Sequence, residues 1–295
     1  MNTKFLEDEG LLEIAKTHPC LSREANITFG RLHLPVSPAC NIQCRFCHRS
    51  LNKTEQRPGV TAQILQPEEA VEKVRQALEL CPEITVAGIA GPGDTLATDS
   101  ALRTFRLVHE AYPDLTLCLS TNGLMLPDYA QKLYDVGVRT VTVTVNAVDP
   151  AIQAQIISYI VFKGIRYVGE EAASILIRRQ LEGIRKIKSL GTIVKVNTVL
   201  IPGVNDDHIE TVAKTVKEAG ADLYNIIPLI PQYEFSDTPA PTCLEIEEAR
   251  RKAGQYIEVF RHCQHCRADA CGIPGRGDLS GKLYGEACAE TFSHG

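Results

Sequence analysis

The sequence predicts an α/β protein, a partial (β/α)6 barrel with a cysteine-bearing extension at each end. Three observations predict this fold. Six strand-like segments alternate with helical ones, the strands have one apolar and one polar face, and polar, Gly- or Pro-containing segments follow the strands. With 295 residues, 44% of them hydrophobic and 23% charged, the chain is long enough to bury one large core.

The predicted elements follow one another along most of the chain. The predicted strands are residues 31–37, 84–90, 115–120, 139–146, 192–200 and 223–230. The predicted helices start at Pro67 and after Pro150, and cover about 99–111, 127–136, 172–190, 206–219 and 244–261. Proline at the first helical position and acidic residues in the first turn favour the helix at Pro67. This alternation predicts a parallel sheet with right-handed crossovers.

The strand faces favour a barrel over a doubly wound sheet. In residues 115–120, the leucines alternate with Thr116, Cys118 and Ser120. A parallel sheet covered by helices on both faces would read as continuous apolar strands, so the polar faces should line a lumen that holds ligand. Small threonines could instead simply fill a tight barrel core. Lys195 on such a face is harder to explain that way, because an unpaired buried charge is costly.

The composition of the chain limits the classes of function that it could have. The acidic N-terminus does not resemble a signal peptide, and no apolar run reaches membrane-helix length. We therefore expect a cytoplasmic protein without a membrane partner. The net charge of -5 and the lack of a basic block argue against a nucleic-acid partner. Eleven cysteines in a reducing compartment indicate metal or redox chemistry rather than disulfides.

The chemistry-bearing segments follow the predicted strands. After successive strands come the cysteine loop at 40–47, AGPGDT at 90–95, STNG at 120–123, NAVD at 146–149, IPGVND at 201–206 and PLIP at 228–231. These segments should meet at the carboxyl ends of the strands, where β/α barrels place their active sites.

The segment CNIQCRFC supplies three thiols, Cys40, Cys44 and Cys47, on one loop. Thiolates at this density bind Zn²⁺ or an iron–sulfur cluster. Structural zinc usually takes four closed ligands, whereas three fit a [4Fe–4S] cluster with one open iron. The motif resembles the signature of the radical S-adenosylmethionine (radical SAM) superfamily, in which an aromatic residue often occupies the position of Phe46.

The resemblance implies that the open iron binds SAM and that reductive cleavage yields a 5′-deoxyadenosyl radical. It also implies contacts to SAM from residues that follow the strands. These are Gly91 and Asp94 near the amino group, Ser120, Asn122 and Asn146 near the carboxylate or ribose, and Ile201 near the adenine.

Other cysteines suggest two further metal sites. The segment CQHCRADAC contains Cys263, Cys266 and Cys271 in a C-x2-C-x4-C pattern; a structural zinc knuckle and free thiols are the alternatives. Cys20, in HPC near the start, could join His33 and Cys118. Taken singly, each of these residues is more often a packed core side chain than a ligand.

The full motif set resembles the branch of the superfamily that matures the nitrogenase iron–molybdenum cofactor. The resemblance rests on HPC, CNIQCRFC, EQRPGV, AGPGD, STNG, VTVNAVDP, IPGVND and CxxCxxxxCGIPG. It implies an enzyme that fuses two [4Fe–4S] clusters into an eight-iron, carbide-containing precursor. SAM would be both the methyl donor and the radical source. With the radical SAM cluster, three [4Fe–4S] clusters are expected in all.

The same resemblance implies roles for particular residues. One substrate cluster would sit on Cys20, His33 and Cys118, and the other on Cys263, Cys266 and Cys271, with Glu55 and Arg57 near the chemistry. The implied partners are a cluster donor, an electron donor such as a ferredoxin, and a downstream scaffold or carrier protein.

Domain organisation and rival functions complete the expectations. We expect a single domain over 1–295, with its core at about 31–262, ligand-bearing extensions at 1–30 and 263–295, and no C-terminal carrier domain. One rival is a radical SAM enzyme with auxiliary clusters that modifies a peptide or small molecule. Another is a non-enzymatic iron–sulfur carrier, for which the SAM-contact segments would have no use. Cys81, Cys243 and Cys288 receive no role.

Overall fold

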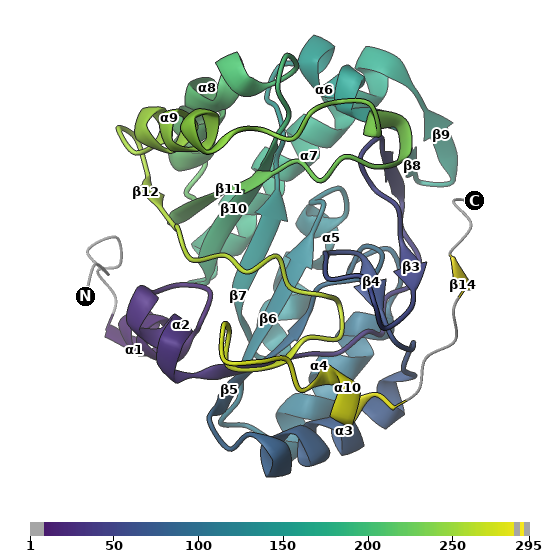
Figure 1. The fold of residues 1–295 in the computed structure, drawn as a ribbon, viewed down its shortest axis with the longest axis vertical. Coiled ribbons are helices and arrows are strands. Elements are labelled where there is room, and N and C mark those ends of the chain that lie inside the picture. The colour runs from purple at the N-terminus through teal and green to yellow at the C-terminus, as the bar shows by residue number, and fades with distance from the viewer. Residues whose placement is uncertain (1–8, 286–289, 292–295) are drawn as a thin grey trace.

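A computed structural model describes residues 9–285 and 290–291. Its main sheet has eight strands in the order β12-β11-β10-β7-β6-β5-β1-β13 (Figure 1). The parallel strands are β1 (Gly30–His33), β5 (Ile84–Ile89), β6 (Thr116–Thr121), β7 (Val138–Thr144), β10 (Ile193–Leu200) and β11 (Leu223–Pro228). The six predicted strands and the partial barrel are confirmed, although β1 ends at His33 rather than at 37.

Short strands extend both edges of this sheet. β12 (Glu258–Val259) runs parallel to β11, and β13 (Cys271–Gly272) runs antiparallel to β1. The chain between them crosses in front of the central strands, as the yellow segment of Figure 1 shows. The C-terminal cysteines therefore lie against the sheet.

The helices follow the predicted alternation. They are α3 (Pro67–Leu80), α4 (Ser100–Ala111), α5 (Leu126–Asp135), α6 (Pro150–Ile156), α7 (Gly169–Ser189), α8 (Ile209–Glu218, after the 3₁₀ turn η1, Asp206–His208) and α9 (Cys243–Ala253). α3 begins with Pro67 and a capping box between Gln66 and Glu69. The prediction that the last of these helices reaches 261 was wrong, because the chain leaves the helix at Gly254 to form β12. Short helices α1 (Glu9–Thr17), α2 (Arg23–Thr28) and α10 (Ser280–Leu283) lie in the extensions.

The two faces of the sheet differ as the sequence predicts. In β6, Leu117 and Leu119 are buried in the main core with Phe105, whereas Cys118 and Ser120 are only half-buried. The leucines pack under the helices because successive strand residues point to opposite faces. Cys118 and Ser120 consequently share the lumen face.

Two small sheets flank the barrel, and the sequence did not predict them. β2 (Ile42–Cys44), inside the cysteine loop, pairs antiparallel with β8 (Ile157–Phe162), which pairs with β9 (Ile165–Tyr167). The other sheet contains β3 (Ser50–Leu51), β4 (Val60–Thr61) and β14 (Glu290–Thr291). The β8–β9 hairpin thus supports the cysteine loop directly.

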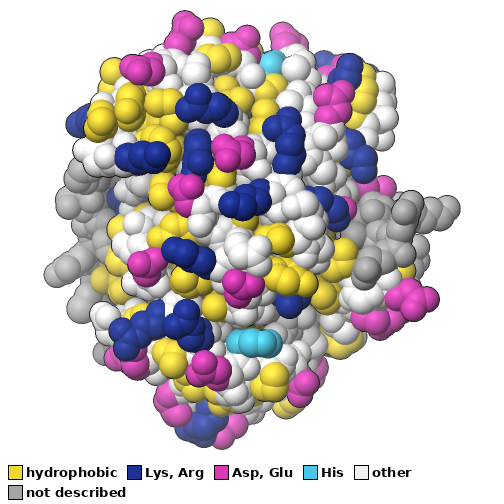
Figure 2. All heavy atoms as spheres, turned by 180° about the vertical axis from the view of Figure 1, so that it is seen from behind, with side chains coloured by type: hydrophobic (Ala, Val, Ile, Leu, Met, Phe, Trp, Pro, Cys, Tyr) yellow, Lys and Arg dark blue, Asp and Glu magenta, His cyan; other side chains and the backbone are white. Residues whose placement is uncertain are grey.

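The outer surface carries charges of both signs. On the face shown in Figure 2, Lys and Arg side chains are interspersed with Asp and Glu, the usual pattern of solvent-exposed helices. No helix within the described ranges has both the length and the hydropathy that a membrane crossing requires.

Candidate functional site

The cysteine loop holds three half-buried thiols beside one another. Gln43 fastens the loop, because its side-chain amide donates to the carbonyl oxygens of Cys44 (2.9 Å) and Cys47 (3.3 Å). Burial, aided by Asp94 and Cys47, raises the pKa of Cys40 to about 12, and burial with the neighbouring thiols raises that of Cys44 well above its usual value. Such thiols keep their protons unless a cation binds them. This donor set fits a [4Fe–4S] cluster, which takes thiolate ligands.

Asp94 joins the loops that follow β1, β5 and β6. Its amide donates to Ala39 O (2.8 Å), next to Cys40. Its carboxylate accepts from Thr121 Oγ1 (3.0 Å), from Leu96 N (2.9 Å) and from the backbone amide of Asn122. The side chain is only 5% exposed, and burial raises its pKa above the usual value. Asp94 therefore orders these three loops, and its expected contact with SAM stays a prediction.

Of the other predicted SAM-contact residues, Asn122 lies against the cysteine loop. Asn122 Nδ2 donates to Asn41 Oδ1 (2.6 Å) and lies 4.0 Å from Cys40 Sγ. Asn146 is buried, and its side-chain oxygen accepts from Val199 N (3.0 Å). Ser120 lies half-buried on the lumen face of β6.

Gly91 and Ile201 occupy the edges of this region. Gly91 has φ +114°, a conformation that favours glycine, and a Cβ there would lie 3.7 Å from the Cβ of Ala268 in the C-terminal extension. Ile201 is fully buried with Leu229, and Phe46 of the cysteine loop packs against their cluster. An apolar wall therefore lies where the adenine was expected.

Glu55 and Arg57 form an ion pair beyond the cysteine loop. Arg57 Nε donates to Glu55 Oε2 (2.6 Å), and the Arg57 guanidinium also donates to His48 O and to Ser50 Oγ (2.9 Å). Burial by itself would raise the pKa of Glu55, but the hydrogen bond and the charge of Arg57 lower that pKa below its usual value. Arg57 holds the loop in shape, while Glu55 keeps 42% of its side chain exposed.

A cross-strand row on the lumen face contains His33, Gly88 and Cys118. The register pairs His33 with Gly88, and Gly88 with Cys118. A Cβ on Gly88 would lie 3.3 Å from His33 Cδ2 and 3.8 Å from Cys118 Cβ. The missing side chain of Gly88 therefore lets the imidazole and the thiol lie close to each other, an arrangement that we call the cradle. Burial and Arg31 lower the pKa of His33 to about 4, so the ring is neutral and can serve as a ligand.

Thiols from three distant parts of the chain meet near this row. Burial raises the pKa of Cys20 to about 12; Lys195 opposes this effect, and Cys266, Cys118 and Cys263 add to it. These thiols must lie close enough for their charges to interact. The structure thus brings Cys20 and Cys118 together as expected, and it adds Cys263 and Cys266 to the same neighbourhood.

Cys271 lies elsewhere. β13 pairs Cys271 with Leu32 and Gly272 with Arg31, so Cys271 shares the helix-side face with Leu32. It is fully buried in the main core, and burial raises its pKa to about 12, with Cys81 adding to the effect. The structure therefore does not bring Cys271 together with Cys263 and Cys266. Within the described residues, no three His, Cys, Asp or Glu side chains gather tightly enough for a single metal ion.

Replacing Cys271 with alanine should consequently leave the iron content of the reconstituted protein unchanged. It should lower the free energy of unfolding by about 1–2 kcal/mol, because a buried sulfur is removed from the core. Iron quantitation of Cys271→Ala beside Cys266→Ala checks this expectation. Loss of the same amount of iron in both variants would restore Cys271 as a ligand.

Sequence reasoning missed a buried ion pair in the C-terminal extension. Arg267 and Asp269 are 3% and 0% exposed, and Arg267 Nε donates to Asp269 Oδ1 (2.8 Å). Arg267 also donates to the carbonyl oxygens of Glu55 (2.6 Å) and Asn52 (2.7 Å). The only signal was a charged pair between motif cysteines. The pair ties the extension to the loop that carries Glu55.

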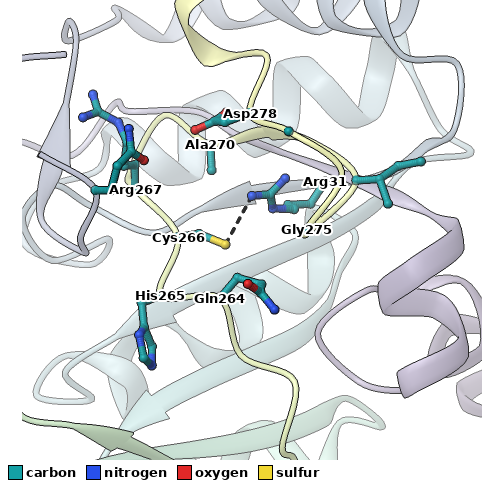
Figure 3. Close-up of a pocket in the computed structure, with 11 residues that line it drawn as sticks. Arg31, Gln264, His265, Cys266, Arg267, Ala270, Gly275 and Asp278 are labelled. Carbon is teal, nitrogen blue, oxygen red and sulfur yellow. Dashed lines mark hydrogen bonds between the residues drawn. The ribbon is translucent and has the colours of Figure 1, made fainter. Parts of the chain in front are cut away.

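A cavity of about 260 Å³ lies beside this ion pair (Figure 3). Arg31, Cys266, Arg267 and Asp278 contribute to its lining, and Arg31 donates to Cys266 Sγ at 3.3 Å. Burial lowers the pKa of Arg31, but Cys266, Cys20 and Asp278 together raise it above its usual value. The cavity therefore places a permanent cation against one motif cysteine.

Comparisons with known proteins agree with this geometry. A model of the radical SAM superfamily matches residues 34–216. The FeMo cofactor biosynthesis protein NifB of Methanocaldococcus infernus is 44% identical over 275 residues, which cover 92% of this chain and 91% of the relative. The chain belongs to the NifB family of radical SAM enzymes. Membership in this superfamily implies a [4Fe–4S] cluster and SAM.

The NifB family also includes longer chains. NifB of Klebsiella pneumoniae is 47% identical over 269 residues, which cover 88% of this chain but only 58% of the relative. This chain therefore spans little more than half of that protein.

Solved structures support the fold. Streptococcus suis SuiB superposes with a TM-score of 0.58 at 13% identity, covering 79% of this chain and 49% of SuiB. A radical SAM methyltransferase from Sphaerobacter thermophilus gives 0.55 at 18% identity, covering 89% of this chain and 69% of that one. This NifB-family chain shares their radical SAM architecture.

Proposed function

We propose that this chain is a radical SAM enzyme of FeMo-cofactor biosynthesis, the process named for its relatives. Its substrates would be two [4Fe–4S] clusters, fused into one eight-iron precursor that contains a carbide. SAM would supply the methyl carbon in one step and the radical in another. The names of the relatives state only the biosynthetic process, and the fusion of two clusters is the part that we add.

The cradle between His33 and Cys118 is the observation that carries the proposal. Cys118 precedes Asn122 by four residues, or about 13 Å along an extended strand. Asn122 in turn lies 4.0 Å from Cys40 Sγ. Cys118 and the cysteine loop thus lie along the same end of neighbouring strands, which supports chemistry between a substrate cluster and SAM.

The polypeptide has distinct tasks in this scheme. When bound, the radical SAM cluster and SAM supply the 5′-deoxyadenosyl radical. Cys40, Cys44 and Cys47 hold that cluster, and Asp94 orders the loops around it. Buried side chains such as Ile201 and Leu229 would help to exclude water. A neutral imidazole at His33 binds iron without adding charge, which favours release of a cluster that must be consumed.

Further ligands and partners belong to the same proposal. Cys20 completes the site with His33 and Cys118, and Cys263 with Cys266 would hold the second substrate cluster, for three [4Fe–4S] clusters in all. A cluster donor, an electron donor such as a ferredoxin, and a scaffold or carrier protein would act before and after this enzyme.

The test is product analysis of anaerobically reconstituted protein, wild type against Gly88→Leu. Wild type given SAM and reductant should release S-adenosylhomocysteine alongside 5′-deoxyadenosine, and its cluster signals should change. Gly88→Leu fills the cradle without a forbidden backbone, because Gly88 has no positive φ. It should keep uncoupled formation of 5′-deoxyadenosine but lose S-adenosylhomocysteine at least about tenfold.

Gly281→Leu is the matched control, since nothing lies within 4 Å of a Cβ at that position. It should behave as wild type. If wild type releases 5′-deoxyadenosine alone and its clusters stay unchanged, the maturase role fails. The rival enzyme that modifies a peptide or small molecule would then be favoured.

A further inference from the structure

Lys195 is a buried cation on the lumen face of β10. It is 7% exposed, and its register partners are Thr142 on β7 and Leu223 on β11. Its ammonium donates to the carbonyl oxygen of Cys20 (3.3 Å) and lies 5.3 Å from the ring centre of Phe260. Among the ion pairs of the described residues, none includes Lys195.

Two thiols and one imidazole lie near Lys195. Its charge acts on Cys20, on Cys118 and on His18. His18 accepts a hydrogen bond from Cys20 N at Nδ1 (3.1 Å), so its Nε2 carries the proton. That Nε2 is fully buried and has no hydrogen-bond partner. Two donors, an ammonium and an imidazole N–H, therefore lie beside Cys20, and among the described residues no carboxylate is paired with Lys195.

This arrangement is costly for the protein alone. An ammonium has three donor hydrogens, and burial without an anionic partner costs several kcal/mol. Aliphatic residues at the corresponding inward positions would pack a barrel core more cheaply. A buried charge kept against that cost indicates a ligand that carries the opposite charge.

We propose that Lys195 is the counter-cation of the substrate cluster held by Cys20 and Cys118. The inference rests on the proposed function and names a residue that the motifs did not assign. Binding exchanges two thiol protons for iron, and Lys195 stabilises the two thiolates so formed. The same positive charge favours the reduced form of the bound cluster, which carries one more electron.

The experiment compares Lys195→Met with Lys195→Arg and Cys118→Ala after anaerobic reconstitution. Lys195→Met should lose the iron of one cluster, about four atoms per chain, together with the EPR signal that Cys118→Ala loses. Lys195→Arg should keep both. Apo Lys195→Met should unfold at a higher temperature than apo wild type, because a buried unpaired charge is gone. A purely structural lysine would give the opposite stability change.

Measuring SAM cleavage and iron content shows whether a negative result contradicts the role of Lys195 or the proposed function itself. Lys195→Met should still form 5′-deoxyadenosine without substrate, since the Cys40–Cys47 loop is intact. Full iron content and an unshifted cluster potential in Lys195→Met would overturn the inference while leaving the proposed function standing. If wild type itself holds only the radical SAM cluster, the proposed function fails, and the inference fails with it.

Discussion

Replacing Gly93 with alanine should weaken SAM binding at least about 100-fold and reduce the iron bound by the Cys40–Cys47 loop. A Cβ on Gly93 would lie 2.0 Å from Ala39 O and 2.6 Å from Ala39 C, distances that real Cβ atoms do not show. Both contacts are to backbone, so no side chain can rotate away. The loop after β5 would have to separate from the loop that begins the cysteine motif.

The separation would break a specific set of hydrogen bonds. Gly93 N donates to Ser37 O (2.7 Å), and Asp94 N donates to Ala39 O (2.8 Å). Moving these groups displaces the Asp94 carboxylate from the amide of Asn122. One methyl group therefore disturbs three loops at once, and each of them is expected to contact the radical SAM cluster or SAM.

Equilibrium dialysis with SAM and iron quantitation measure the effect, and far-UV circular dichroism reports on the fold. Gly281→Ala is the control, because it adds the same methyl group to an open site in α10. Its SAM affinity should match that of wild type. A Gly93→Ala protein that keeps its iron and binds SAM within threefold of wild type would contradict the steric argument.

Local sequence patterns predict the barrel but not how its edges are completed. Strand alternation in residues such as Leu117 and Cys118 was enough to predict six parallel strands and a polar lumen, because period-two patterns depend only on neighbours. The β8–β9 hairpin was missed. Its run ISYIVF directly follows α6, and a short apolar run does not distinguish a strand from a buried helical segment.

Some candidate ligands could likewise be predicted from local spacing, whereas others depend on strand pairing. Spacing alone grouped Cys271 with Cys263 and Cys266, but its direction depends on the pairing of β13 with Leu32. A shift of one residue in that register would turn Cys271 to the lumen. Gly88 likewise gave no signal, because its importance lies in what two neighbouring strands place beside it. The predicted site residues at 40–47 were easier, since a single loop carries all three.

Arg267 and Asp269 offer the second large expected effect, on stability. Arg267 makes hydrogen bonds to Asp269, Glu55 O and Asn52 O, and Asp269 also accepts from Ala62 N. Both side chains are almost fully buried. Removing one partner of a buried pair costs about 3–5 kcal/mol, because the other charge is left without compensation.

Asp269→Leu should therefore lower the melting temperature of the apo protein by roughly 10 °C, given about 2–4 °C per kcal/mol for domains somewhat smaller than this one. The double variant Arg267→Met/Asp269→Leu removes both charges and should recover most of that loss. It should not recover the link to the loop of Glu55, so limited proteolysis near 52–58 should be faster than in wild type. Calorimetry and digestion thus report separately on buried charge and on loop anchoring. A double variant no more stable than Asp269→Leu would show that the hydrogen bonds, rather than the charge balance, dominate the stability of this extension.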